Sequence, residues 1–284
     1  MAEIRNDGAT LKILTWLFIL FLVVYVGFPF YWMFISSIKS PLEVSLAPPT
    51  YWPKAPRWIN YVDIWTAIPF LREMFNSVFI TIATVLVSLA LTSTTAYSLS
   101  RFRFKGRDFV IGLFLFVQLV PLVVYLIPLY FVLLRLHLIN RYLGLIICYG
   151  TIGLPFMALV MRSYFKNAYP LELEEAALID GSSRFGTFLR IGLPLTRTGL
   201  IAVGTMTAIN TWKEFLFASI VINKGPMRPV SVGIFDLVGQ MGLSMTQLGI
   251  FMTACTLVVV PLVIAFLFIQ RFIVEGIASG SIKG

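Results

Sequence analysis

The sequence is poor in charge. Only 12% of its 284 residues are Asp, Glu, Lys or Arg, whereas an ordinary soluble domain carries about 25%. Hydrophobic residues make up 58% of the chain. A soluble fold of this length could not bury so much apolar surface, so a bilayer must serve as part of the solvent. The composition excludes a water-soluble protein and predicts an all-α integral membrane protein.

Cysteine and histidine are scarce as well. Cys148 and Cys255 both lie in apolar runs, where a free cysteine behaves as a small core residue, and their spacing fits neither a disulfide framework nor a metal site. The single histidine, His137, falls in a predicted outer loop. No nucleophile with its base and no paired carboxylates stand out. We therefore expect no catalytic residue and no metal ligand, which disfavours an intramembrane enzyme.

The net charge of +9 has two readings. A basic chain can bind nucleic acid, but no soluble basic domain is present to do so. Lys and Arg that flank membrane spans and face lipid head groups account for the excess instead. We expect membrane lipid, and no nucleic acid, as a partner.

Six apolar runs are long enough to cross a bilayer, which takes about 20 helical residues. They cover residues 13–38, 74–99, 109–134, 142–164, 200–222 and 248–269. The first lacks a small-residue cleavage site and is expected to be an uncleaved anchor. The Pro-, Trp- and Tyr-rich stretch 39–65 that follows it predicts an ordered interfacial loop. Pro121, Pro128 and Pro155 predict local kinks within spans.

The placement of Lys and Arg orients the chain. Four basic residues occupy positions 101–107, in the short loop between the second and third spans. Short cytoplasmic loops are enriched in basic residues. This loop and both termini are therefore predicted to be cytoplasmic. The expected organisation is an N-terminal segment at 1–12, a six-helix domain at 13–272 with a cytoplasmic loop at 166–197, and a cytoplasmic tail at 273–284.

The cytoplasmic loop contains an unusually polar stretch, EEAALIDGSSRFGTFLRIGLP, at residues 174–194. Pro170 and the acidic residues after it suit a helix start, and Gly181 suits its end. Ser182 or Ser183 can cap a second helix, which Pro194 is expected to end. The loop is thus predicted to be two helices joined by a glycine break.

Small side chains on the first of these helices allow two interpretations. Ala176 and Ala177 would let the helix sink into a groove on another protein. An amphipathic helix that rests on the membrane surface is the alternative, and the residues alone leave both open.

The spacing of Glu175-Ala176-Ala177, Gly181 and Ile191-Gly192-Leu193-Pro194 resembles the EAA loop of binding-protein-dependent ABC importer permeases. MRSYFKNAYPLELEEAALIDGSS and the ending QRFIVEGIASGSIKG are similar to the smaller permease subunit of the maltose-transporter type, in the carbohydrate-uptake branch. The resemblance covers nearly the whole chain and implies the type I ABC importer permease fold.

The resemblance also implies partners. Such a permease would form half of a sugar pathway with a second, homologous permease in the bacterial or archaeal cytoplasmic (inner) membrane. Two cytoplasmic ABC ATPase subunits would bind ATP and Mg, and an external solute-binding protein would deliver the sugar. No G-x-x-x-x-G-K-[ST] phosphate loop occurs in this chain, so no cofactor and no ATP hydrolysis are expected here. The tail would either reach the ATPase or fray.

Coupling to the ATPase would fall to the EAA loop. Glu175 would hold the docked geometry, the two alanines would permit close approach, and Gly181 would allow the sharp turn. The implied coupling residues are Glu175, Ala176, Ala177, Asp180, Gly181, Ile191, Leu193 and Pro194.

Polar residues inside the fifth span indicate where a solute would pass. A charge near the middle of a span costs at least about 2.5 kcal/mol and normally faces a cavity or a partner. Asn210 and Glu214 would share a helix face. An interhelical contact with the partner permease, or a Lys213 that reaches outward to the interface, remains open. The candidate pathway residues are Asn210, Trp212, Lys213, Glu214 and, in the third span, Gln118.

Other solutes and other transporters stay as alternatives. The solute could be a non-sugar such as glycerol phosphate. A secondary transporter driven by an ion gradient would usually show inverted repeats and more intramembrane acids, and neither is evident.

Overall fold

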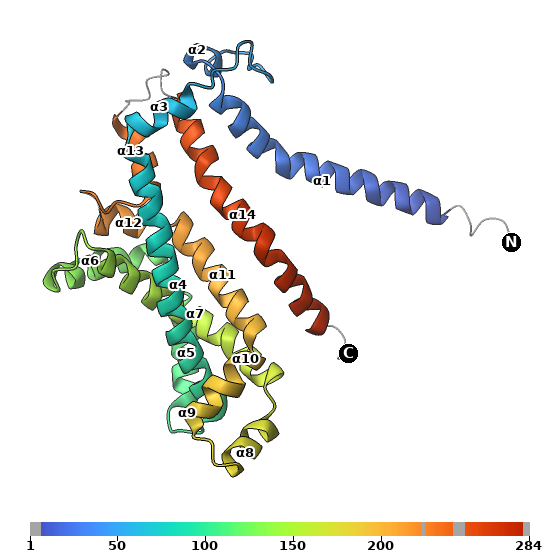
Figure 1. Ribbon diagram of the computed structural model, residues 1–284, viewed down its shortest axis with the longest axis vertical. Helices are drawn as coiled ribbons and strands as arrows, with labels where there is room; N and C mark the ends of the chain where they lie inside the picture. The colour runs from blue at the N-terminus through green and yellow to red at the C-terminus, as the bar shows by residue number, and fades with distance from the viewer. Residues whose placement is uncertain (1–6, 223–224, 241–247, 281–284) are drawn as a thin grey trace. The chain divides into compact units, whose positions relative to one another are not determined.

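The regular structure is entirely helical. The computed structural model describes residues 7–222, 225–240 and 248–280, and no strand occurs among them (Figure 1). The chain divides into two units: Met1–Phe70 with Ile234–Pro261, and Leu71–Gly233 with Leu262–Gly284. The all-α prediction is confirmed.

Four helices in the described part of the chain are long and apolar enough to cross a membrane. They are α1 (Asp7–Ser37), α4 (Phe70–Arg101), α7 (Tyr142–Ala168) and α14 (Leu248–Gly280). They correspond to the expected first, second, fourth and sixth spans. Each is longer than expected, although α1 ends at Ser37, one residue before the expected end of the first span. Long uninterrupted apolar runs leave the backbone no partner but itself, so these four runs form helices.

The expected third span is not one helix. The segment forms α5 (Arg107–Val117), a 3-10 turn η1 (Leu122–Tyr125) and α6 (Leu126–Arg135), with a bend of 104° between the two parts. Pro121 lies in the break, where it has no N–H to donate and disfavours a helical residue before it. Pro128 falls in the first turn of α6, where a missing N–H costs little. The two parts together make a fifth candidate span.

The expected fifth span, 200–222, is also interrupted, so the prediction of one continuous helix is wrong. The segment forms α11 (Arg197–Lys213) and α12 (Leu216–Val221), separated at Glu214 and Phe215. Neither helix alone reaches the roughly 20 residues that a crossing needs.

The stretch 39–65 in the first unit is ordered, as expected. It carries the short helix α2 (Pro41–Val44) and leads into α3 (Asn60–Ala67). The buried Glu43 carboxylate accepts from the Thr50 hydroxyl and the Lys54 backbone N–H, both at 2.9 Å. The Asn60 amide donates to the Ser37 carbonyl at 2.7 Å. These bonds satisfy polar groups that a loop of this kind would otherwise leave unpaired.

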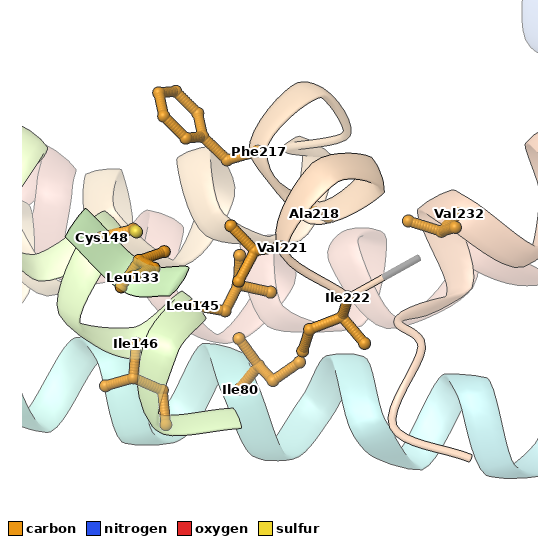
Figure 2. Packing of buried hydrophobic residues seen from close by; sticks show 10 residues of the cluster. All are labelled: Ile80, Leu133, Leu145, Ile146, Cys148, Phe217, Ala218, Val221, Ile222 and Val232. Carbon is orange, nitrogen blue, oxygen red and sulfur yellow. The ribbon is translucent and has the colours of Figure 1, made fainter. Parts of the chain in front are cut away.

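Helix α7 is central to the second unit, where it contacts α5, α11 and α12. A Cβ added at Gly199 would lie 2.5 Å from the Tyr164 ring, so α11 packs closely against α7. Near the start of α7, at the other end of that helix from Tyr164, a buried apolar cluster joins α4, α6, α7, α12 and α13 (Val230–Gln240). Its members are Ile80, Leu133, Leu145, Ile146, Cys148, Phe217, Ala218, Val221, Ile222 and Val232 (Figure 2).

The C-terminal segment is more regular than expected. α14 continues to Gly280, beyond the predicted end of the sixth span at 269 and through most of the tail at 273–284. The last four residues of that tail, 281–284, lie outside the described residues.

Candidate functional site

The polar loop forms two helical elements that follow the predicted pattern at three points. α8 (Leu171–Ile179) begins directly after Pro170 and carries acids in its first turn. Gly181 ends the turn at φ +85°, a left-handed conformation that favours glycine. Ser183, rather than Ser182, caps α9 (Arg184–Thr187), because its hydroxyl accepts from the Gly186 N–H at 3.0 Å.

The prediction that Pro194 ends the second helix is wrong. The helical run continues from α9 through a π-helical turn, η2 (Phe188–Gly192), into α10 (Leu193–Leu195). The Leu193 N–H bonds the Phe188 carbonyl five residues back. This wide turn precedes the proline ring, which would otherwise clash with the carbonyl four residues before it. The run ends at Thr196, whose hydroxyl donates to Gly192 at 2.8 Å.

One acid of α8 is buried against the end of α4. The Tyr97 hydroxyl donates to Glu174 Oε1 at 2.6 Å, and Arg101 Nε lies 3.0 Å from Glu174 Oε2. The side chains of Arg101 and Glu174 are 9% and 7% exposed. Removing one partner of such a buried pair costs about 3–5 kcal/mol, because the remaining charge stays buried.

Arg101 also holds the end of α7. Its guanidinium donates to the Tyr169 carbonyl and to the Phe165 carbonyl, the latter at 3.3 Å, and it stacks on the Tyr169 ring at 4.3 Å. A cation suits the negative end of a helix dipole. Burial raises the pKa of the Tyr169 hydroxyl to about 12, and the nearby Glu174 carboxylate adds to the rise. Tyr169 therefore stays protonated at neutral pH, and Arg101 joins α4, α7 and α8.

Sequence reasoning singled out Glu175 and missed Glu174. Glu175 is exposed, whereas Glu174 is the acid that binds Arg101. Helical spacing could have indicated Glu174, because it precedes Ala177 by three residues and so shares a helix face with that buried alanine. Ala176 lies on the exposed side, so the two alanines play different parts in the structure.

The remaining predicted coupling residues divide in the same way. Asp180, Gly181 and Pro194 are exposed. Ile191 and Leu193 pack against the buried cluster around Tyr97, Phe165 and Phe188, and stay partly accessible. Two large apolar side chains nearby are strongly exposed, Ile179 at 86% and Phe185 at 66%. Figure 1 shows α8 and α9 together at one end of the second unit.

A cavity of about 540 Å³ lies at the break between α11 and α12. Of the five candidate pathway residues, Asn210, Lys213 and Glu214 line it. Trp212 is buried elsewhere, and Gln118 is exposed, with its amide donating to its own helix at Phe114. The other lining residues are Leu122, Tyr149, Ile152, Gly153, Met157, Thr207, Thr211, Phe215, Leu216 and Phe217.

Glu214 explains the break. Its backbone is extended, and its carboxylate turns forward onto the start of α12. Oε1 accepts from the Phe217 N–H at 2.9 Å, and Oε2 accepts from the Ala218 N–H at 3.1 Å. The Tyr149 hydroxyl of α7 donates to Oε2 at 2.5 Å. The carboxylate thus acts as the cap of a new helix, where free N–H groups need an acceptor. Asn210 and Glu214 share the cavity but not one continuous helix face.

The chain is similar to known transport proteins. Residues 89–279 match the family described as binding-protein-dependent transport system inner membrane component. The chain is 35% identical to the probable ABC transporter permease protein YurM of Bacillus subtilis, over 95% of this chain and 88% of that protein. It is 30% identical to the sulfoquinovosyl glycerol transport system permease protein SmoH of Agrobacterium fabrum, over 90% and 89%.

A solved structure shares the fold. A chain of a bacterial ABC transporter involved in the import of the acidic polysaccharide alginate superposes with a TM-score of 0.79 at 21% identity. The match covers 94% of this chain and 97% of the other. The described helices therefore have the fold of an ABC importer permease.

Proposed function

Since the chain belongs to the family of inner membrane components of binding-protein-dependent transport systems, we propose that it forms half of the translocation pathway for a sugar or oligosaccharide. It is a permease subunit of such an importer and a multi-pass protein of the inner membrane. Importers of this kind combine permeases with ATPase subunits and a solute-binding protein. We propose one homologous permease and two ABC ATPases as its partners, with Mg and ATP held by the ATPases.

Six spans with both termini in the cytoplasm are part of the proposal. The four long helices count as one span each, and the pairs α5–α6 and α11–α12 count as broken spans. Irregular backbone at membrane depth is tolerated where it lines a cavity, and the break between α11 and α12 does so. The four basic residues at 101–107 support a cytoplasmic position for that loop.

Residues 166–197 are proposed as the coupling segment that docks on an ATPase subunit. One side of α8 is held by Arg101 and Tyr97, which leaves the other side accessible. That outer side presents Ala176 and Ile179, and Phe185 of the neighbouring α9 is exposed as well. Exposed apolar groups of this size, rimmed by acids, suit insertion into a cleft on a partner. The C-terminal tail at 273–284 is a second proposed contact with the ATPase.

Transport would then be an exchange between two arrangements of the permease pair. ATP binding to the ATPases would favour one arrangement and hydrolysis the other. Because Arg101 joins α8 to the ends of α4 and α7, a displacement of the coupling segment would move both helices with it.

The cavity is proposed as the part of the pathway that this chain supplies. Asn210 and Thr211 offer hydrogen-bonding groups, and Phe215 offers an aromatic ring. The hydroxyl groups of a sugar could bond to the two polar side chains, and the flat face of its ring could stack on the aromatic ring. The sugar assignment also draws on the Agrobacterium permease, whose name specifies sulfoquinovosyl glycerol.

The observation that carries the proposal is the match of residues 89–279 to the family, with a cavity at a broken helix inside that range that is largely apolar and carries a few polar side chains. The test is uptake of labelled sugars by proteoliposomes that contain the assembled importer. Uptake should require ATP, the solute-binding protein and this chain. ATP-independent uptake driven by an ion gradient would contradict the proposal.

A further inference from the structure

The fold already uses three of the six polar side chains that line the cavity, those of Tyr149, Thr207 and Glu214. The Glu214 carboxylate accepts from Tyr149 and from two backbone N–H groups. The Tyr149 hydroxyl is occupied by that same contact. The Thr207 hydroxyl shares a hydrogen bond of 3.3 Å with Ser88. Because these groups hold the structure together, they have little capacity left for a solute.

Lys213 is in a different position. It is the last residue of α11, its side chain is exposed, and it lines the cavity. The ion pairs found among the described residues are Arg57–Asp63, Arg101–Glu174 and Arg228–Glu73, and none includes Lys213. The adjacent acid, Glu214, faces the start of α12. The cavity therefore offers a solute an ammonium group but no equally available carboxylate.

A lysine at membrane depth needs an anion or water, because lipid cannot solvate its charge. The cavity supplies room for both. Asn210 lies one helical turn before Lys213 and lines the same cavity. Its amide, together with the three N–H donors of the ammonium, gives a site in which donors outnumber acceptors.

We propose that Lys213 is a specificity-determining residue that binds an oxyanion carried by the solute. This deepens the proposed function and rests on the cavity being part of the sugar pathway. The solute class is an acidic carbohydrate, such as one bearing a uronic carboxylate. A neutral sugar would leave the ammonium without a counter-charge at the break between the two helices.

Lysine suits this role in a pathway. Its ammonium is a point charge on a flexible stem, so it accepts an oxyanion in several orientations. A transport site must bind well enough for entry and weakly enough for release. A single mobile cation meets both needs, whereas a rigid bidentate clamp would favour retention.

The test compares acidic and neutral sugars on the assembled importer in lipid nanodiscs, without its solute-binding protein. Maltose and cellobiose are each paired with the counterpart whose non-reducing glucose is glucuronate. Equilibrium binding of all four is measured for the native chain, K213Q and K213R. The native chain should prefer the acidic member of at least one pair. K213Q should lower that preference at least about tenfold, the usual effect of losing a charged hydrogen bond, and K213R should keep it.

A chemical rescue keeps the test valid if K213Q does not assemble. In a chain without Cys148 and Cys255, K213C is modified with an aminoethyl or a sulfonatoethyl thiosulfonate. The aminoethyl group should restore the acidic preference, and the sulfonatoethyl group should not.

Two results would overturn the inference: no acidic preference in either pair, or an equal loss of both members in K213Q. The second would indicate that Lys213 contacts the partner permease or lipid. The N210A variant distinguishes a failure of the Lys213 inference from a failure of the proposal that the cavity is part of the sugar pathway. If N210A weakens neutral sugars while charge has no effect, the pathway stands and the charge selection fails. If no sugar binds at all, both proposals fail.

Discussion

Arg101 Nε lies 3.0 Å from Glu174 Oε2, across 73 residues of sequence, and this pair is almost completely buried. It joins the last residue of α4 to the first turn of α8. Because the same guanidinium donates to carbonyls at the end of α7, three elements share one side chain. The proposed coupling segment is thereby fixed to two membrane helices on one side and accessible on the other.

Loss of the Glu174 carboxylate should destabilise the permease. In E174Q the Arg101 charge stays buried without its partner, a change worth about 3–5 kcal/mol for a pair of this kind. The melting temperature of the purified importer should fall, and protease cleavage within residues 166–197 should become faster. E172Q, an exposed acid on the same helix, is the matched control and should change either readout little. Equal effects of the two variants would contradict the assignment.

A double variant tests whether the pair acts as a unit. R101M/E174M removes both charges, and replacing a buried ion pair by apolar groups is often neutral or stabilising. The double variant should therefore be more stable than either single variant. Additive losses would indicate that the two residues act independently.

Ala176 and Ala177 should differ as contact sites for an ATPase subunit. Ala176 is exposed and Ala177 is buried. A benzophenone attached to A176C, in a chain without the native cysteines, should crosslink to the ATPase in the assembled importer. The same reagent should scarcely label A177C, because the thiol is covered. Crosslinking from both positions with equal yield would mean that α8 turns a different face to its partner.

Phe185 should contribute to ATPase docking without supporting the fold. Its ring touches the buried Phe188 ring but is 66% exposed, so F185S mainly removes apolar surface that the fold leaves accessible to a partner. Copurification of the ATPase should decrease, and the melting temperature of the permease pair alone should remain within the small range of surface substitutions. A large loss of permease stability would instead assign Phe185 to the fold.

The close approach of α11 to α7 should tolerate no side chain at Gly199. A Cβ at this position would meet the Tyr164 ring at 2.5 Å, and overpacking of this kind costs about 1–3 kcal/mol. G199A should lower the yield and the melting temperature. G112A is the matched control, since a Cβ there meets nothing within 4 Å and alanine favours the helix. Y164A should restore G199A only in part, because it removes the ring atoms but keeps the Tyr164 Cβ, 2.8 Å from the added methyl group.

The helix content could be predicted from the sequence wherever an apolar run continues without a competing signal. α1, α4, α7 and α14 follow such runs. The run at 109–134 also looked continuous, although Pro121 marked the place where it breaks. Apolar composition indicates which segments face lipid. It does not indicate where the backbone hydrogen bonds of a helix are interrupted.

The break at Glu214 could not be predicted, because its cause lies elsewhere in the chain. A lone glutamate in a span is compatible with an unbroken helix. Glu214 becomes a helix cap because its carboxylate accepts from the backbone N–H groups of α12 and from the hydroxyl of Tyr149. Tyr149 lies 65 residues earlier in the sequence, in α7. Glu174 was missed for a similar reason. The pattern around Glu175 matched the family, whereas the partner of Glu174 is visible only in three dimensions.

Tyr149 lies near the start of α7 and Tyr169 directly follows its last residue, Ala168. The two tyrosines are 20 residues apart, which corresponds to about 30 Å along a helix. Tyr149 donates a hydrogen bond to the Glu214 carboxylate, which caps the start of α12, and the Tyr169 ring stacks against the Arg101 guanidinium. One residue inserted between them would rotate the two ends by about 100° relative to each other. The contact of Tyr149 with Glu214 and the contact of Tyr169 with Arg101 could not then form together. The number of residues between the two tyrosines, more than their composition, therefore sets the relative orientation of these contacts.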